Sequence, residues 1–287
     1  MQDTDKLNMI CAKTFRRSFF TSLAKGEDVN HMFLAFKDLF INDGDARVRD
    51  VFDFFFNFLR KNYRNEYVYK TAIVNKIIFG RHSPKTSSSA IELPVNNSIV
   101  DVAIFNGNST AYEIKTEFDT PKRLATQTID YLDVFDKVYI VTHPKFVDKY
   151  CSLNVPNVGV ISLSKKDTLK IEKEAVSNIN NIKLDKVFNI LRKDEYVRIV
   201  EDYTSSKLSM PNGLIYNFCK EVFISMPLGV ANTYFVSAMR KRATDKDFID
   251  YLYSLPACLR ALGYATPLSK KQKDYIVNLM DSKVGSH

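Results

Sequence analysis

Two strand-like runs joined by a short turn constrain the fold of this chain more than any other stretch. Ser98–Phe105 and Thr110–Lys115 are rich in β-branched and apolar residues, as strands are. Between them, Asn106-Gly107-Asn108 is a turn signal, because glycine tolerates positive φ and asparagine visits it more readily than most residues. We therefore expect a β-hairpin in which Phe105 faces Ser109.

That hairpin would bring charged side chains together. In this register Asp101 falls opposite Glu113, and cross-strand neighbours lie roughly 4.5–5.5 Å apart. Glu113 and Lys115 are two residues apart on one strand, so their side chains share a face. A slip of one residue would separate the two acids, because it turns every side chain of one strand to the opposite face.

These three side chains suit the hydrolysis of a phosphodiester. Two carboxylates on adjacent strands bind Mg²⁺ or Mn²⁺, which prefer oxygen ligands and keep waters for the substrate. Such an ion activates a water, and Lys115 can stabilise the charge that develops on the phosphate. The alternative is an exposed strand that carries an ion pair. Against it, the three charges lie in runs that otherwise bury apolar side chains, where an uncompensated charge is costly.

The flanking stretches predict further helices and strands. Helices are expected over Tyr63–Phe79, ended by Gly80, and from Asp119-Thr120-Pro121, a capping signal, to Phe135. A polar loop, RHSPKTSSSA, separates the first helix from the strands. Further strand candidates are Ile91–Val95, Lys137–Thr142, Val158–Leu163 and, at the sheet edge, Thr168–Glu172. The order from Tyr63 to Thr142 is therefore α-β-β-β-α-β.

This order, with the spacing D-x(11)-E-x-K, resembles the PD-(D/E)XK nuclease superfamily. The longer string DVAIFNGNSTAYEIKTEFDTPKRLATQTIDYLDVFDKVYIV resembles one bacterial branch of it. That branch shares D-(V/I)-x(4)-N-G, then AYEIK, D-T/S-x(2)-RL-x(2)-Q and a YxxVFDxVYxV-like tail. The proline that usually precedes the first aspartate of the superfamily is Val100 here.

The resemblance implies a role for each matching position. Asp101 and Glu113 would be ligands of Mg²⁺ or Mn²⁺, with the backbone carbonyl of Ile114 as a third. Lys115 would be the catalytic lysine, and Gln127, on the following helix, the accessory residue. Tyr131 follows Gln127 by one turn, on one stripe with Arg123. The superfamily often adds a glutamate on the first core helix. Glu66 is the candidate, and Glu92 competes with it.

The resemblance also implies the fold. We expect an α/β, restriction-endonuclease-like αβββαβ core, a mixed central sheet flanked by helices, with N-terminal helices and a helical C-terminal module. The expected segments are 1–60, 61–175 and 176–287. The N-terminal helices are expected over 5–24, 27–42 and 47–59, the last deeply buried by its five phenylalanines. The C-terminal helices are expected over 183–203, 212–224, 228–243, 245–254 and 269–283.

The charge of the chain favours a polyanionic partner. The net charge is +8, and residues 60–91 hold seven Lys/Arg against one acid. Phosphate contacts beside the site are expected from Arg81, His82, Lys85, Lys70 and Arg123. A basic, solvated surface without a partner is the alternative.

The sequence thus leads to one functional hypothesis and two alternatives. The hypothesis is a Mg²⁺- or Mn²⁺-dependent deoxyribonuclease that acts on double-stranded or branched DNA, with endo- and exonucleolytic action both open. The alternatives are a catalytically inactive binding or assembly subunit with the nuclease fold, and an RNA-directed nuclease. No apolar run reaches membrane length, no signal peptide is seen and the four cysteines form no CxxC pair, so we expect a cytoplasmic protein.

Overall fold

The computed structural model of the chain describes residues 2–27, 46–153 and 155–284. The chain forms two compact units, one of Met1–Gly80 and Lys246–His287 and one of Arg81–Asp245. The expected segments 1–60, 61–175 and 176–287 cut the sequence differently. The last helices pack with the first ones, and the helices that directly follow the sheet stay with the sheet.

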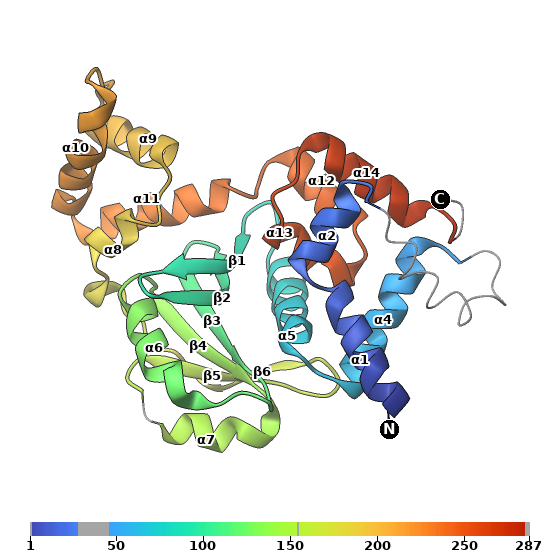
Figure 1. Ribbon diagram of the computed structural model, residues 1–287. Coiled ribbons are helices and arrows are strands. Elements are labelled where there is room, and N and C mark those ends of the chain that lie inside the picture. The colour runs from blue at the N-terminus through green and yellow to red at the C-terminus, as the bar shows by residue number, and fades with distance from the viewer. Residues whose placement is uncertain (1, 28–45, 154, 285–287) are drawn as a thin grey trace. The chain divides into compact units, whose positions relative to one another are not determined.

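The first unit is built from helices. They are α1 (Gln2–Thr14), α2 (Arg17–Ala24), α4 (Val48–Asn62), α5 (Glu66–Ile73), α12 (Lys246–Ser254), α13 (Arg260–Ala265) and α14 (Lys270–Asp281) (Figure 1). Helix α14 packs on α2 and α4, which joins the two ends of the sequence. The single helix expected over 5–24 is two helices, and the one expected over 27–42 lies outside the described residues.

Helix α4 is amphipathic rather than deeply buried. Phe52 and Phe55 are in the core, whereas the side chain of Phe54 is 40% exposed. Three of the phenylalanines, at 54, 55 and 56, are consecutive, and consecutive positions of an α-helix point in different directions, so the five cannot all face one core. The expectation that all five belong to the core is therefore corrected.

The helix expected over Tyr63–Phe79 changes its winding halfway. Helix α5 ends at Ile73, and a π-helical segment continues from Val74 to Arg81. Gly80 thus lies inside this segment, contrary to the prediction that it ends the helix. The π-helical winding is a tertiary outcome that the apolar spacing, which is compatible with an α-helix, does not signal.

The second unit contains a mixed, six-stranded sheet. Its strands are β1 (Ser88–Val95), β2 (Ser98–Phe105), β3 (Ser109–Lys115), β4 (Lys137–Thr142), β5 (Val158–Leu163) and β6 (Leu169–Lys173). They lie in the order β1-β2-β3-β4-β5-β6, with β3, β4 and β5 parallel and the other neighbours antiparallel. The predicted strands are confirmed, but β1 starts at Ser88, inside the expected polar loop.

The β2–β3 hairpin has the predicted register. Phe105 pairs with Ser109, and the ladder continues to the pair of Val102 with Tyr112. Asp101 and Glu113 occupy the next position of the same register. The hairpin therefore sets the two acids on neighbouring strands, as the turn residues predict.

Helices α6 (Leu124–Leu132) and α7 (Val147–Ser152) pack on this sheet, α6 against β2 and β4 and α7 against β5. A 3₁₀ turn, Pro121–Arg123, precedes α6, so this helix is shorter than the expected span to Phe135. Asp119 does not cap it, contrary to the prediction. Its carboxylate accepts hydrogen bonds from the backbone N–H and the hydroxyl of Thr116 instead.

The helices after the sheet are α8 (Leu184–Phe188), α9 (Lys193–Thr204), α10 (Asn212–Ser225) and α11 (Leu228–Lys241). The single helix expected over 183–203 is broken between α8 and α9. The carboxylate of Glu195 accepts from the backbone N–H of Arg192 at 2.7 Å, which fixes the start of α9, and also binds the Arg242 guanidinium through two hydrogen bonds. None of the helices in the described part of the chain is both long and apolar enough to span a membrane.

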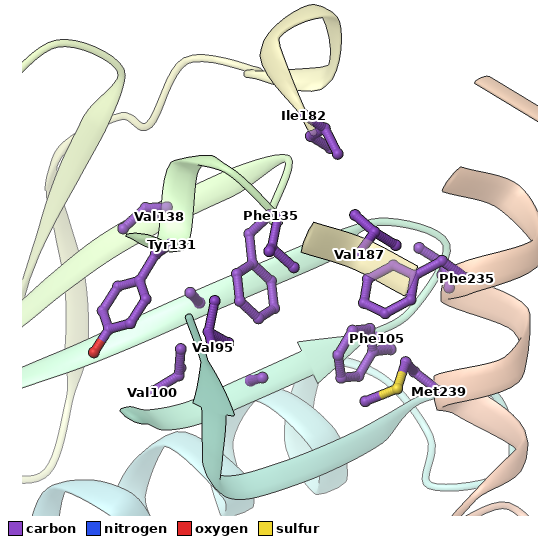
Figure 2. Packing of buried hydrophobic residues seen from close by; sticks show 14 of the residues in the cluster. Val95, Val100, Phe105, Tyr131, Phe135, Val138, Ile182, Val187, Phe235 and Met239 are labelled. Atoms are coloured by element: carbon purple, nitrogen blue, oxygen red, sulfur yellow. The ribbon is translucent and has the colours of Figure 1, made fainter. Parts of the chain in front are cut away.

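The core of the second unit lies between the sheet and helices α6 and α8–α11. Phe105 is central: its ring meets Phe235 of α11 edge to face at 5.7 Å and lies 6.2 Å from the ring of Phe135 (Figure 2). Such aromatic pairs add to the stability that burial itself supplies. The helices after the sheet therefore complete the core of the sheet and do not form a separate module.

Gly159 offers a test of how tightly the second unit is packed. A Cβ atom at this position in β5 would lie 2.5 Å from the Tyr139 ring and 2.6 Å from the backbone nitrogen of Ala175. Gly159→Ala is expected to lower the free energy of unfolding by about 1–3 kcal/mol, the usual cost of overpacking. The measurement is urea unfolding followed by circular dichroism. Gly213→Ala is the control, because nothing lies within 4 Å of its added Cβ; equal stabilities of the two variants would contradict this packing.

Candidate active site

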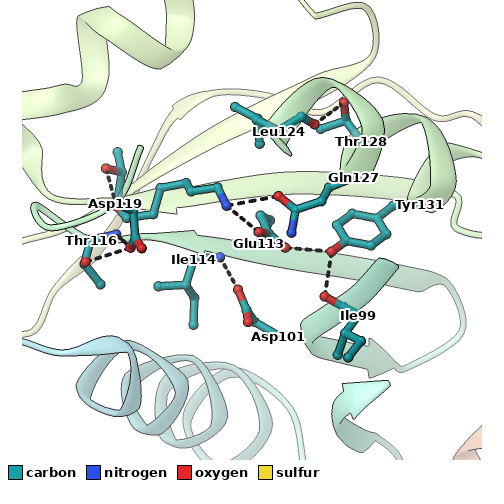
Figure 3. Close-up of polar contacts among 12 residues, drawn as sticks. Ile99, Asp101, Glu113, Ile114, Thr116, Asp119, Leu124, Gln127, Thr128 and Tyr131 are labelled. Atoms are coloured by element: carbon teal, nitrogen blue, oxygen red, sulfur yellow. Dashed lines mark hydrogen bonds and ion pairs between the residues drawn. The ribbon is translucent and has the colours of Figure 1, made fainter. Parts of the chain in front are cut away.

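Lys115 is the centre of a buried polar cluster over the β2–β3 hairpin. Its Nζ donates to Glu113 Oε1 at 2.7 Å and to Gln127 Oε1, from α6, at 3.1 Å (Figure 3). Glu113 is 2% exposed and Lys115 is 8% exposed. The Thr142 hydroxyl, from β4, donates to the carbonyl oxygen of Lys115 at 2.8 Å and holds this end of β3. The structure thus brings Glu113, Lys115 and Gln127 together.

Tyr131 joins this cluster from the next turn of α6. Its hydroxyl lies 2.8 Å from Glu113 Oε2 and 2.7 Å from the carbonyl oxygen of Ile99, and its side chain is buried. Burial, together with the Glu113 and Asp101 carboxylates, raises the pKa of Tyr131 well above its usual range, so the hydroxyl remains a proton donor. Tyr131 is not among the site residues predicted from the sequence. The signal was its i, i+4 spacing from Gln127.

Asp101 lies where the β2–β3 ladder ends. Its Oδ2 accepts a hydrogen bond from the backbone N–H of Ile114 at 2.7 Å. The last backbone pair of the ladder is Val102 with Tyr112. A side-chain oxygen therefore takes the place that a backbone carbonyl occupies in a regular ladder. This bond ties the carboxylate of β2 to the strand that carries Glu113 and Lys115.

Of the two candidate accessory acids, only Glu92 lies in the unit that holds this cluster. Glu92 is opposite Asp101 in the β1–β2 register, at a gap between the pairs Ile91 with Val102 and Leu93 with Val100. Its φ is +55°, a left-handed conformation that is uncommon for a residue with a side chain. Glu66 is the first residue of α5, in the other unit, where its carboxylate lies 2.5 Å from Lys70 Nζ.

The structure does not gather the expected phosphate-binding residues at the cluster. Burial raises the pKa of Tyr112, and the positive charge of Arg81 opposes this rise, so Arg81 lies near Tyr112, whose side chain is on the sheet face opposite Glu113. His82 Nε2 lies 2.7 Å from Nδ2 of Asn106. Asn106 is in the hairpin turn, at the end of β3 that is far from Lys115. Lys85 is exposed in the loop before β1.

Lys70 and Arg123 differ sharply in their surroundings. Lys70 is buried in α5 and paired with Glu66. Arg123 is exposed at the start of α6, one helical turn before Gln127. Of the five predicted phosphate contacts, Arg123 is therefore the one that a described element places next to the cluster.

The donor set is suitable for a divalent ion. Asp101 and Glu113 supply carboxylate oxygens from neighbouring strands, and a carboxylate has about four lone-pair sites, of which the bonds of Glu113 to Lys115 and Tyr131 use two. Among the described residues, no group of three or more His, Cys, Asp or Glu side chains could hold a metal. An ion here would therefore need the Ile114 carbonyl or water to complete its ligands.

Removing the Tyr131 hydroxyl tests the role of the cluster in stability. Tyr131→Phe leaves Glu113 Oε2 and the Ile99 carbonyl without this donor, so we expect a loss of about 1–3 kcal/mol in unfolding free energy at pH 7. Tyr203→Phe, on the exposed end of α9, is the control and should change little.

The pH dependence gives an independent readout of the same tyrosine. The folded-state pKa is raised, so the contribution of Tyr131 to stability is present below the unfolded pKa of about 10 and is lost as the pH rises above it. Between pH 10 and 11 the wild type should lose about 1 kcal/mol more unfolding free energy than Tyr131→Phe, because the tyrosine of the unfolded chain goes from half to almost fully ionised over this range. Identical slopes in urea titrations would show that Tyr131 ionises freely in the folded protein.

Comparison with known proteins identifies one related family. Residues 59–249 match the family described as bacteriophage P4 protein cII, and this span includes Asp101, Glu113, Lys115 and Gln127. Protein cII of Enterobacteria phage P4 is 30% identical over 161 residues, which cover 53% of this chain and 58% of that protein. The chain thus spans less than two thirds of this relative. No solved structure matches the chain. Because the match covers most of its length, the chain belongs to the bacteriophage P4 protein cII family.

Proposed function

We propose that the second unit is a metal-dependent deoxyribonuclease with a restriction-endonuclease-like core. The observation that carries the proposal is the buried contact of Lys115 with Glu113 and Gln127, at the point where Asp101 bridges β2 and β3. The element order of the second unit, β1-β2-β3-α6-β4, supports the βββαβ part of the arrangement that the resemblance implies, whereas the first helix of that arrangement, α5, belongs to the other unit. The four residues come from three consecutive elements, β2, β3 and α6, and share one side of the sheet.

The carboxylates would hold the metal. Asp101 and Glu113, with the Ile114 carbonyl, offer Mg²⁺ or Mn²⁺ the oxygen ligands that both ions prefer. When bound, the ion would supply Lewis acidity and lower the pKa of a water that attacks the phosphorus. Without a metal, the ammonium of Lys115 partly neutralises Glu113, which limits the desolvation free energy that a buried carboxylate costs.

The other residues orient these groups. Gln127 accepts from Lys115 and so directs the ammonium, which can donate to a phosphoryl oxygen and stabilise its developing charge. Tyr131 occupies one oxygen of Glu113 and limits the rotation of that carboxylate. Glu92, opposite Asp101 in the register, is the acid that could assist there, in preference to Glu66.

The charge of the chain supports DNA as the partner. The net charge is +8, and Lys122 and Arg123 are exposed at the start of α6, next to Gln127. Cations near the site neutralise phosphates and position the backbone without reading sequence.

Cleavage assays test the proposal directly. Purified protein with Mg²⁺ or Mn²⁺ is expected to nick or degrade supercoiled and linear DNA, and Asp101→Ala and Lys115→Ala are each expected to reduce the rate by at least about 100-fold, as loss of a transition-state contact does. Lys166→Ala, exposed in the turn between β5 and β6, is the matched control and should cleave like the wild type. Cleavage of RNA but not DNA would support the RNA-directed alternative. No cleavage of either by the wild type would leave a non-catalytic binding subunit.

Metal binding is tested separately from cleavage. Glu113→Gln keeps the shape of the side chain but removes its charge, so titration calorimetry should show that Mn²⁺ binding is lost. Glu117→Gln, exposed in the following loop, is the control and should bind Mn²⁺ as the wild type does. Unchanged binding by Glu113→Gln would remove Glu113 from the ligand set.

A further inference from the structure

The connection from β3 to α6 presents an aromatic ring beside the candidate active site. Phe118 is 58% exposed and follows Lys115 by three residues. Three residues span at most about 10 Å even when fully extended, which is about three base steps of a duplex. Anything bound with its phosphate at Lys115 therefore has neighbouring nucleotides within reach of this ring.

The backbone that carries Phe118 is held rigidly. The Thr116 hydroxyl donates to Asp119 Oδ2 at 2.7 Å and accepts from the backbone N–H of Phe118 at 3.2 Å. Asp119 Oδ2 also accepts from the Thr116 N–H at 2.8 Å, and the Asp119 N–H donates to the Thr116 carbonyl. Thr116 itself is buried. Four hydrogen bonds thus fix a short turn whose outward side chain is apolar.

A turn held in this way differs from an ordinary surface loop. Scattered apolar side chains on a surface are ordinary. Here, however, part-buried hydrogen bonds hold the backbone that presents the ring, and an aromatic side chain on a fixed backbone loses little conformational entropy when it binds, because it has only two χ angles. The exposed cations Lys122 and Arg123 follow within five residues. The acids Glu117 and Asp119 flank the ring directly, and the cations lie further along the same connection. An aromatic ring with cations within reach is a pattern by which proteins bind single-stranded nucleic acid.

We infer that Phe118 stacks on an unpaired base of the substrate, next to the phosphate that Lys115 contacts. Inside an intact duplex each base is stacked on its neighbours and offers no free face, whereas a frayed end, a gap or a branch does. The substrate class is therefore DNA with unpaired nucleotides beside the reacting phosphate. This inference rests on the proposed function and specifies its substrate.

Binding of a fluorescent oligonucleotide tests the stacking. The probes carry 2-aminopurine, whose fluorescence falls on stacking, either in a single-stranded gap or at the same position of a full duplex. Binding is measured in a Lys115→Ala background, so that the probes stay intact. Adding Phe118→Ala is expected to weaken binding of the gapped probe roughly ten-fold, as base–aromatic stacking predicts, and to abolish the fluorescence change. Binding of the full duplex should be unchanged.

Two further variants act as controls. Leu214→Ala removes a side chain of the same exposure, 58%, from α10 and should bind both probes like the parent. Phe118→Tyr keeps the ring and should restore gapped-probe binding. The inference is overturned if the parent and Phe118→Ala bind both probes equally. It is also overturned if Phe118→Tyr fails to restore binding of the gapped probe, because the loss would then not come from the absence of a ring that stacks on a base.

Cleavage by the chain with Lys115 intact separates this inference from the proposed function. If the wild type cleaves gapped DNA faster than duplex DNA and Phe118→Ala removes that preference, both stand. If the wild type cleaves and Phe118→Ala keeps the same preference, the inference falls and the nuclease remains. If nothing is cleaved but gapped-probe binding depends on Phe118, the nuclease falls and the stacking stands.

Discussion

The buried pairing of Lys115 with Glu113 is the interaction on which the candidate site depends. Two opposite charges at i and i+2 of one strand would be an ordinary surface feature if they were exposed, and there they would contribute little. Here both are nearly inaccessible, and each has a further partner from α6, Gln127 or Tyr131. Removing one member would leave the other as an uncompensated buried charge. Helix α6 is therefore required for the pair as much as the strand that carries it.

The same strand is also the boundary between the two halves of the sheet. On one side β3 pairs antiparallel with β2, and on the other it pairs parallel with β4. The antiparallel half delivers Asp101 through a tight turn, whereas the parallel half requires the crossover that contains α6. The hairpin turn leads into β3, and the crossover leads out of β3 and brings α6 back to it. This explains why acid, lysine and amide meet there, although the turn with Phe118 lies between lysine and amide in the sequence.

The sequence predicts the hairpin, its register and four members of the cluster, because each is a local property. Turn residues set the pairing of Phe105 with Ser109, and period-two alternation then places Asp101 and Glu113. What it does not predict are properties of tertiary packing. Residue type does not tell that Glu66 belongs to the other unit or that Arg81 lies near Tyr112, because the sequence does not show which way a charged side chain points in the fold. Asp119 resembles a helix cap in the sequence, but a competing bond with Thr116 takes its carboxylate.

The short sequence separations within the cluster have a consequence for how the site assembles. Asp101 contacts Ile114 over thirteen residues, Lys115 contacts Gln127 over twelve, and the longest link, Tyr131 to Ile99, spans thirty-two. Contacts between residues close in sequence cost little loop-closure entropy and form quickly. The hairpin can therefore set the acids in place before α6 docks, and the docking of one helix then converts a paired strand into a charged, desolvated centre.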